Sequence, residues 1–263
     1  QKNINEYRLE VGNHVTGILC PSGEYAGSLA DYFGAPSSVK EPDVILQLNI
    51  VVHDDEIEIP ESLFTAKKVD GRTFVIGDGV IRGEIASGPA EIRLWVKKGL
   101  MIGQRTRVFE QILYQAFYSC RMIRQSNAVL AHCSGVLFRK DGFMFAGPSG
   151  SGKSTIASLS RGHHVLNDEI CLLEFGTSGI TIHGTPFNGF FKDKKGGSAP
   201  LKAVFLLGHG ASHTISSPKE ADAIPLLAKE IVPPVALHEQ QSVRIFIAMM
   251  DLSLIHISEP TRP

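Results

Sequence analysis

The chain has 263 residues, an apolar fraction of 43% and a formal net charge of -1. This length provides a core for one large domain or two small ones, and the balanced charge argues against a general affinity for nucleic acid or membranes. Its four cysteines are scattered with no C-x-x-C pair, which is typical of reduced thiols in the cytoplasm rather than of a disulfide scaffold or a zinc site.

The first region, 1–103, predicts a small α+β unit dominated by antiparallel strands. Residues 7–19 read as extended structure interrupted by glycines, and 22–33 read as a helix with Ser22 as its N-cap. A strand is expected over 43–52 because β-branched and aliphatic residues dominate it. The side chains expected on its inner face are Val44, Leu46 and Leu48.

Short strands broken by turns are predicted between residues 64 and 96. Asp70-Gly71 and Asp78-Gly79 are hairpin signals, because these pairs adopt the turns that join antiparallel strands. The acidic run over 54–58 is interpreted as a solvated turn before Pro60 rather than as a metal site. This region shows no catalytic constellation, and a role in docking a substrate or partner is left open.

A helix over 104–125 is predicted to connect the two halves of the chain. Its apolar residues recur at helical spacing: Phe109, Ile112, Leu113, Ala116, Phe117, Cys120 and Ile123. Its other face carries Arg105, Arg107, Arg121 and Arg124. A solvated face explains these arginines better than a nucleic-acid stripe, since the whole chain is nearly neutral.

The second half contains a phosphate-binding loop of the G-x-x-x-x-G-K-[ST] type. Its nine residues are Gly147, Pro148, Ser149, Gly150, Ser151, Gly152, Lys153, Ser154 and Thr155. The glycines let backbone N–H groups surround phosphate oxygens, Lys153 reaches the outer phosphates and the Ser154 hydroxyl binds Mg²⁺. A strand over 143–146 and a short helix over 155–160 flank the loop, so the sequence predicts binding of a nucleoside triphosphate such as ATP.

Strands and turns alternate on both sides of the loop. Expected strands before it are 129–132, 135–138 and 143–146, the last two joined as a hairpin by a turn at 140–142; those after it are 165–166, 170–175, 180–183 and 200–207. A capping box at Ser217-Pro-Lys-Glu220 predicts a helix over 221–231 with Pro218 at its first position. The fold class is therefore α/β in this half and α+β overall.

Asp168, fifteen residues after Lys153, is the expected carboxylate partner of the loop. It is placed to bind Mg²⁺ with Ser154 or to accept a proton from an attacking hydroxyl. Because only a short helix and one loop intervene, the strand that ends at Asp168 is expected beside the strand over 143–146. Glu169 alternates to the opposite side of the strand and is a weaker candidate.

Two familiar classes of phosphate-loop protein do not fit. An ABC-type ATPase would carry an L-S-G-G-Q-like signature downstream, and none is present. Guanylate kinase has a similar loop, but there the loop lies near the N-terminus and a monophosphate-binding domain follows.

The second half instead resembles the HPr kinase/phosphorylase superfamily, which shares its catalytic core with phosphoenolpyruvate carboxykinase. The segments that carry the resemblance are 131–138, 147–155, 161–169, 184–189 and 199–207. The first half looks, more loosely, like the variable N-terminal region of HPr-kinase-related proteins. The chain then divides into an N-terminal region (1–103), a connecting helix (104–128), an HPr-kinase-like nucleotide-binding domain (129–251) and a tail (252–263).

The resemblance implies an ATP- and Mg²⁺-dependent kinase that phosphorylates a serine of a protein or peptide. The family's paired acidic motif is matched by Asn167-Asp168, so an amide replaces one carboxylate and Asp168 acts as metal ligand, base or both. His132 matches a family histidine near the phosphates, where it would orient Asp168 or contact the γ-phosphate. The catalytic residues implied are therefore Lys153, Asp168 and His132.

Other features of this half have two interpretations each. Lys192, Lys194 and Lys195 would steer an anionic substrate or belong to a solvated loop, and Thr185 and Pro186 would shape the floor of the site. The alternative function is a nucleotide-binding regulatory or assembly module with little phosphotransfer, which Asn167 favours. No nucleic-acid partner is expected, and homo-oligomerisation is left open.

The last residues of the chain, 252–263, have a sequence unlike that of the rest. Residues 252–262 resemble the translation of a transposon-based sequencing-library adapter, so 252–263 is predicted to be non-native. The apolar stretch over 243–257 carries Arg244, Asp251 and His256 and is too short and polar for a membrane span. The family's arginine-bearing catalytic stretch has no match here, since Arg244 fits it poorly.

Overall fold

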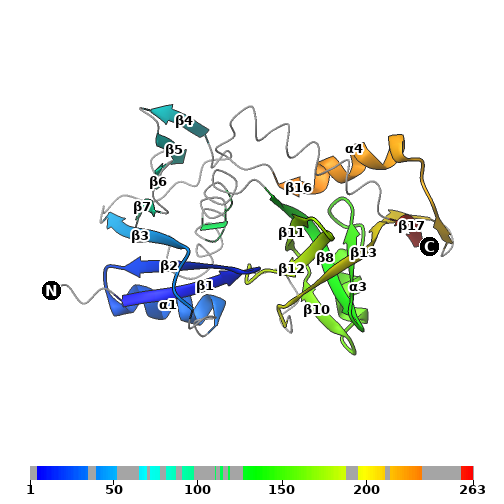
Figure 1. Cartoon of the computed structure of the whole chain (residues 1–263), viewed down its shortest axis with the longest axis horizontal. Coiled ribbons are helices and arrows are strands. Elements are labelled where there is room, and N and C mark those ends of the chain that lie inside the picture. The colour runs from blue at the N-terminus through cyan, green and yellow to red at the C-terminus, as the bar shows by residue number, and fades with distance from the viewer. Residues whose placement is uncertain are drawn as a thin grey trace. The chain divides into compact units, whose positions relative to one another are not determined.

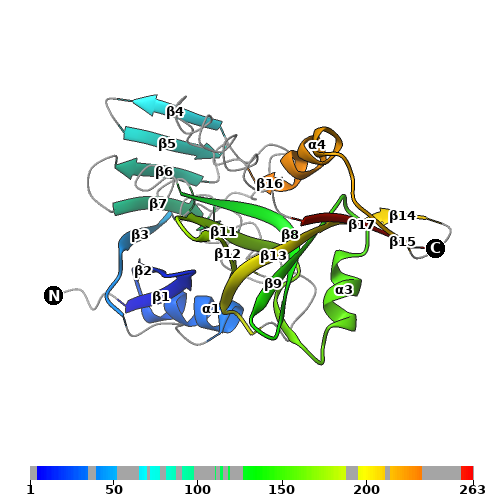
Figure 2. The same cartoon turned by 45° about the vertical axis from the view of Figure 1, so that its right-hand side comes forward.

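The computed structural model describes a defined part of the chain: residues 5–34, 40–51, 65–69, 72–77, 81–86, 91–97, 110, 113–114, 118, 127–187, 195–210, 214–232 and 256–262. The chain divides into two compact units between residues 124 and 125, inside the predicted connecting segment. Each unit has its own sheet (Figures 1 and 2). The fold is a mixture of helices and sheets, as the α+β prediction requires.

The first unit contains one seven-stranded sheet in the order β1-β2-β3-β7-β6-β5-β4. The strands are β1 (Asn5–Val11), β2 (His14–Cys20), β3 (Val44–Val51), β4 (Thr65–Val69), β5 (Arg72–Gly77), β6 (Ile81–Ala86) and β7 (Glu91–Lys97). Parallel pairing occurs at β2–β3 and β3–β7, and the other neighbours are antiparallel. The pairs β4–β5 and β5–β6 are antiparallel, as the two predicted hairpins require, and the turn residues themselves lie outside the described residues.

Helix α1 (Gly23–Phe33) packs against β1 and β2. It confirms the predicted helix and its N-cap position, although Ser22 makes no side-chain capping hydrogen bond. The predicted inner face of β3 is also confirmed, since Val44, Leu46 and Leu48 are all buried. The core of the unit is therefore built from regularly spaced aliphatic side chains.

Only four positions of the predicted connecting helix are described. Glu110, Leu113, Tyr114 and Tyr118 are helical, and Leu113 and Tyr118 are buried. The Tyr32 hydroxyl donates a hydrogen bond of 2.8 Å to Glu110 Oε2. The four arginines of the polar face and the acidic run over 54–58 lie outside the described residues, so their interpretations stay predictions.

The second unit is built around a closed circuit of strands. The elements are β8 (Ala128–Phe138), β9 (Asp141–Ala146), α3 (Lys153–Leu159), β10 (His164–Asn167), β11 (Ile170–Gly176), β12 (Gly179–Gly184), β13 (Ser198–Leu206), β14 (Gly208–His209), β15 (Thr214–Ser216), α4 (Glu220–Glu230), β16 (Ile231–Val232) and β17 (His256–Arg262). Pairing runs β8-β11-β12-β13-β9 and returns to β8, with β9 and β13 parallel. The predicted hairpin before the phosphate loop is confirmed as β8–β9.

Three expectations for this unit are wrong. Residues 128–138 form one continuous strand, β8, rather than two. The strand β10 pairs with β8 and not with β9, so β8 lies between the loop-bearing strand and the strand that precedes Asp168. Helix α4 has Lys219 at its N-cap with no side-chain cap, so the predicted capping box does not form.

Cys20, Cys133 and Cys171 are buried and form no disulfide, whereas Cys120 lies outside the described residues. Within the described part of the chain, no helix is long and apolar enough to cross a membrane. Strand β17 lies in the tail and pairs in parallel with β13, and the non-native origin of the tail stays a prediction.

Candidate functional site at the centre of strand β8

Strand β8 brings the phosphate loop close to the turn between β10 and β11, residues 167–170, which we call the acidic turn. Cys133 pairs with Ala146, the last residue of β9, on one side. On the other side β8 changes partner: His132 pairs with Ile170 of β11, and Gly135 pairs with Asn167 of β10. The backbone N–H of Cys133 also donates to the Glu169 carbonyl at 3.1 Å. The loop after β9 and the turn over 167–170 therefore start from neighbouring points on one strand.

The phosphate loop has the backbone conformation that its glycines predict. Gly147, Gly150 and Gly152 have φ angles of 153°, 83° and 104°, a region that residues with a Cβ rarely adopt. A Cβ on Gly147 would also lie 2.9 Å from the Leu207 carbonyl of the chain after β13. Residues 148–150 at the loop rim are exposed, so the loop can admit an anion from solvent.

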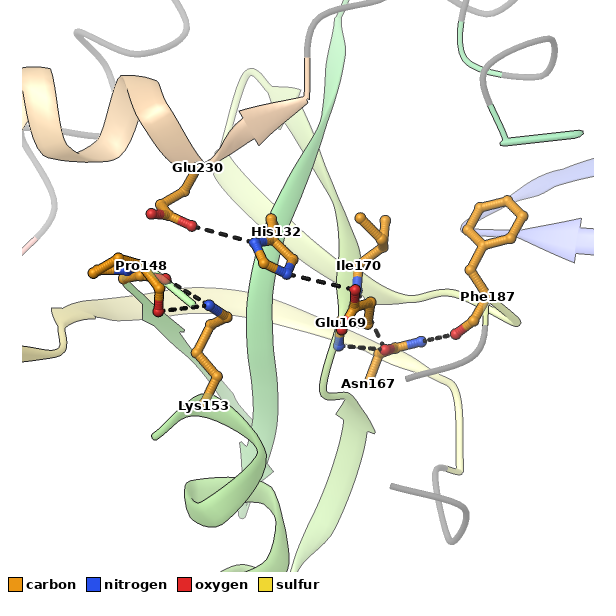
Figure 3. A network of polar contacts seen from close by, with 9 residues as sticks. His132, Pro148, Lys153, Asn167, Glu169, Ile170, Phe187 and Glu230 are labelled. Carbon is orange, nitrogen blue, oxygen red and sulfur yellow. Dashed lines mark hydrogen bonds and ion pairs between the residues drawn. The ribbon is translucent and has the colours of Figure 1, made fainter. Parts of the chain in front are cut away.

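Lys153 is the first residue of α3 and turns back across this loop. Its side chain is 6% exposed, and Nζ donates to the carbonyls of Gly147 at 2.5 Å and Pro148 at 3.2 Å (Figure 3). A buried ammonium needs a strong acceptor or an anion, and two carbonyls supply only dipoles. The donor set fits a polyphosphate, whose oxygens would replace the loop carbonyls as acceptors for the Lys153 ammonium.

The residues available for Mg²⁺ are oxygen donors. Ser154 lies in the first turn of α3, and the Asp168 side chain, in the turn between β10 and β11, is 1% exposed. The described residues contain no cluster of three or more His, Cys, Asp or Glu that could hold a metal. Mg²⁺ at nucleotide sites commonly takes one or two protein oxygens and completes its shell with phosphates and water. The hydroxyl of Ser154 and the carboxylate of Asp168 have that chemistry.

The Asn167 amide is held by hydrogen bonds within the protein. Its side chain is fully buried, and Nδ2 donates to the carbonyls of Thr185 and Phe187, both at 2.8 Å. Its Oδ1 accepts from the backbone N–H groups of Glu169 at 2.8 Å and Ile170 at 3.3 Å (Figure 3). These partners fix the amide orientation, since a flip would oppose oxygen to two carbonyls. Asn167 is thus a structural residue that shapes the acidic turn, not a substitute metal ligand.

His132 lies between two carboxylates, and neither of them is Asp168. Its Nε2 is 3.6 Å from Glu169 Oε1, and its Nδ1 is 3.5 Å from Glu230 Oε2 (Figure 3). Glu169 and then Glu230 raise the pKa of His132 to about 9, against the opposing effects of burial and of the Lys153 charge. His132 is therefore an imidazolium at neutral pH and cannot serve there as a proton acceptor.

Two carboxylates contact His132, and the sequence pattern predicts no role for Glu230 and ranks Glu169 below Asp168. The expectation that a regular strand carries Glu169 is wrong, because Glu169 lies in a turn, where its carboxylate pairs with His132. Glu230 reaches the site because β16 pairs Ile231 with Ala131, next to His132. One signal could have found it: a glutamate as the last residue of a helix opposes the helix dipole and needs a cation nearby.

Among the other predicted site residues, Thr185 and Lys195 are described by the structure. Thr185 is buried and its hydroxyl donates to the Ile170 carbonyl at 2.6 Å, consistent with a role in the floor of the site. Lys195 is exposed, and its backbone N–H donates to the Val165 carbonyl at 3.0 Å. Lys192, Lys194 and Arg244 lie outside the described residues.

Comparison of the sequence with models of known protein families and with curated proteins finds no match. The family resemblance therefore rests on the segments given above.

Replacing Asn167 with aspartate is expected to destabilise the protein, not to restore a catalytic pair. A carboxylate would face two carbonyls and lose two donated hydrogen bonds, which costs about 3 kcal/mol or more at a buried site. Urea unfolding measures the loss. Asn13→Asp, in the exposed turn between β1 and β2, is the matched control and is expected to stay within about 0.5 kcal/mol. An Asn167→Asp protein as stable as the wild type would contradict the structural role.

The contribution of His132 to stability is expected to disappear at high pH. Folding raises its pKa from 6.5 to about 9, so the stabilisation is complete below pH 6.5 and is lost as pH rises to about 9. Such a shift is worth about 3 kcal/mol in a fully buried group. Solvent screening of a side chain that is 34% exposed reduces this to about 1–2 kcal/mol.

Urea unfolding of the wild type and His132→Gln at pH 6 and pH 9.5 tests this dependence. The difference in unfolding free energy between the two proteins is expected to shrink at the higher pH. An equal difference at both pH values would show that His132 contributes through packing and not through charge.

Proposed function

We propose that the chain is an ATP-dependent kinase of the HPr-kinase-like type that transfers the γ-phosphoryl group to a serine of a protein or peptide. One observation carries the proposal. The strand β8 sets a phosphate loop with a buried lysine beside a turn that holds a buried aspartate. Phosphoryl transfer needs little more from a protein than such positioning and charge stabilisation.

The acidic pair of the proposed site is Asp168-Glu169 and not Asn167-Asp168. The Asn167 amide is committed to protein hydrogen bonds on both its atoms. Glu169, in contrast, pairs with His132 at 3.6 Å and so ties the turn that carries Asp168 to β8. Asp168 and Glu169 supply two adjacent carboxylates, so the amide at residue 167 does not favour a module without phosphotransfer.

The side chains of the proposed site bind the phosphates, accept the proton and hold the metal ion. Lys153 moves from the loop carbonyls to the outer phosphates, where its charge stabilises the transferring group. Asp168 accepts the proton of the serine hydroxyl as that oxygen attacks the γ-phosphorus in line. Mg²⁺, when bound through Ser154 and Asp168, neutralises charge on the phosphate oxygens. The imidazolium of His132 anchors Glu169 and supplies positive charge beside Lys153.

Incubation with γ-labelled ATP, Mg²⁺ and a degenerate serine-containing peptide library tests the proposal. Label is expected in phosphoserine, and a library with alanine in place of serine is the control. ATP binding without transfer to any peptide or protein substrate would instead support the nucleotide-binding module.

A further inference from the structure

Glu230 occupies a position that is unfavourable unless it meets a cation. It is the last residue of α4, so its charge lies at the negative end of the helix. It is also 7% exposed, which removes most of the water that would otherwise stabilise the carboxylate. The cost is offset by the imidazolium of His132, whose Nδ1 lies 3.5 Å from Glu230 Oε2.

His132 is the one half-exposed residue in the stretch of β8 over 128–136, where every neighbour is buried. Its ring projects from the strand between two carboxylates that come from different elements (Figure 3). Glu169 belongs to the acidic turn, and Glu230 belongs to the α4–β16 junction. With one carboxylate on each ring nitrogen, a rotation of the ring by 180° would put carbon atoms in place of both nitrogens and lose both contacts.

The consequence extends to Asp168. Glu169 follows it directly in the chain, so the Glu169–His132 pair limits the movement of the whole turn. The backbone contributes a second restraint through the hydrogen bond from Cys133 N–H to the Glu169 carbonyl. Loss of Glu230 would release Nδ1 and leave the ring free to turn away from Glu169.

We propose that Glu230 is a positioning residue of the phosphotransfer site, which holds the His132 ring against Glu169 and thereby fixes the turn that carries Asp168. The inference rests on the proposed kinase function. It gives α4 and β16 a direct part in the site, although the sequence pattern predicts no site residue in either element.

Steady-state kinetics of Glu230→Gln tests the assignment. The value of kcat is expected to fall roughly 10–100-fold, the usual effect of removing a group that orients a site residue. The KM for ATP is expected to change less than about 3-fold, because the phosphate loop is untouched. Glu230→Asp keeps the charge and is expected to recover part of kcat, which a purely structural role does not predict.

The chain offers a matched control in a second Glu–His pair. Glu174 Oε2 lies 3.2 Å from His183 Nε2 on β11 and β12, and Glu174→Gln is expected to leave kcat unchanged. A double variant, His132→Gln with Glu230→Gln, is expected to be no slower than the slower single variant, because both act through one contact.

A Glu230→Gln protein with wild-type kcat, or single effects that multiply in the double variant, would overturn the role of Glu230 alone. A wild-type protein that binds ATP but transfers no phosphoryl group would overturn the proposed function, and the role of Glu230 with it.

Discussion

Replacing Lys153 with alanine is expected to weaken ATP binding roughly 10–100-fold and to abolish measurable phosphoryl transfer. The ammonium is directed into the phosphate loop, where it donates hydrogen bonds to the Gly147 and Pro148 carbonyls. A hydrogen bond to a charged group contributes about 1.5–3 kcal/mol, which sets the loss in affinity. Transfer suffers more because the same charge stabilises the phosphoryl group in the transition state.

Isothermal titration with ATP in the presence of Mg²⁺ measures the binding step. Lys140→Ala, which removes an exposed lysine from the β8–β9 turn, is the matched control and is expected to bind ATP as the wild type does. If Lys153→Ala bound ATP with undiminished affinity, the loop would not be the phosphate site.

Replacing Asp168 with asparagine is expected to lower kcat by about 10²–10⁴-fold, the range associated with loss of a general base. The change keeps the size of the side chain and removes its ability to take the serine proton. Because the loop and Lys153 remain, ATP measured without Mg²⁺ is expected to bind nearly as tightly as to the wild type. Binding with Mg²⁺ is expected to weaken, since one oxygen donor of the metal loses its charge.

Single-turnover transfer of labelled phosphate separates these two effects. Asp222→Asn, on the exposed side of α4, is the matched control and is expected to leave transfer unchanged. Transfer at the wild-type rate by Asp168→Asn would remove Asp168 from the mechanism. Such a result would leave the buried carboxylate without a catalytic role.

Local sequence patterns were sufficient to place the loop and most of the elements around it. The glycines at 147, 150 and 152 predict a loop with positive φ angles, which other residues rarely adopt. The hairpin before the loop follows from a turn between two apolar runs. Likewise, the alternation of Val44, Leu46 and Leu48 predicts the buried face of β3. These features depend on neighbours in the chain, so they can be read without knowing the fold.

Features that depend on pairing between distant strands could not be predicted in this way. The register of β8 decides that His132 meets Glu169, and the pairing of β16 with β8 decides that it also meets Glu230. From the sequence, Asn167 is interpreted as the replacement of a carboxylate. An amide N–H donor is required there by the carbonyls of Thr185 and Phe187, which lie eighteen and twenty residues away in the chain. A strand position that requires an amide looks the same in sequence as one that has lost an acid.

The most direct test of the account compares the affinities of the wild-type protein for ATP, ADP and AMP, each with Mg²⁺, by calorimetry. A loop that binds outer phosphates through Lys153 predicts that ATP binds at least about 10-fold more tightly than AMP, since the charged contact is worth about 1.5 kcal/mol or more. Equal affinity for ATP and AMP, or binding of neither, would contradict the assignment of residues 147–155 as a triphosphate site.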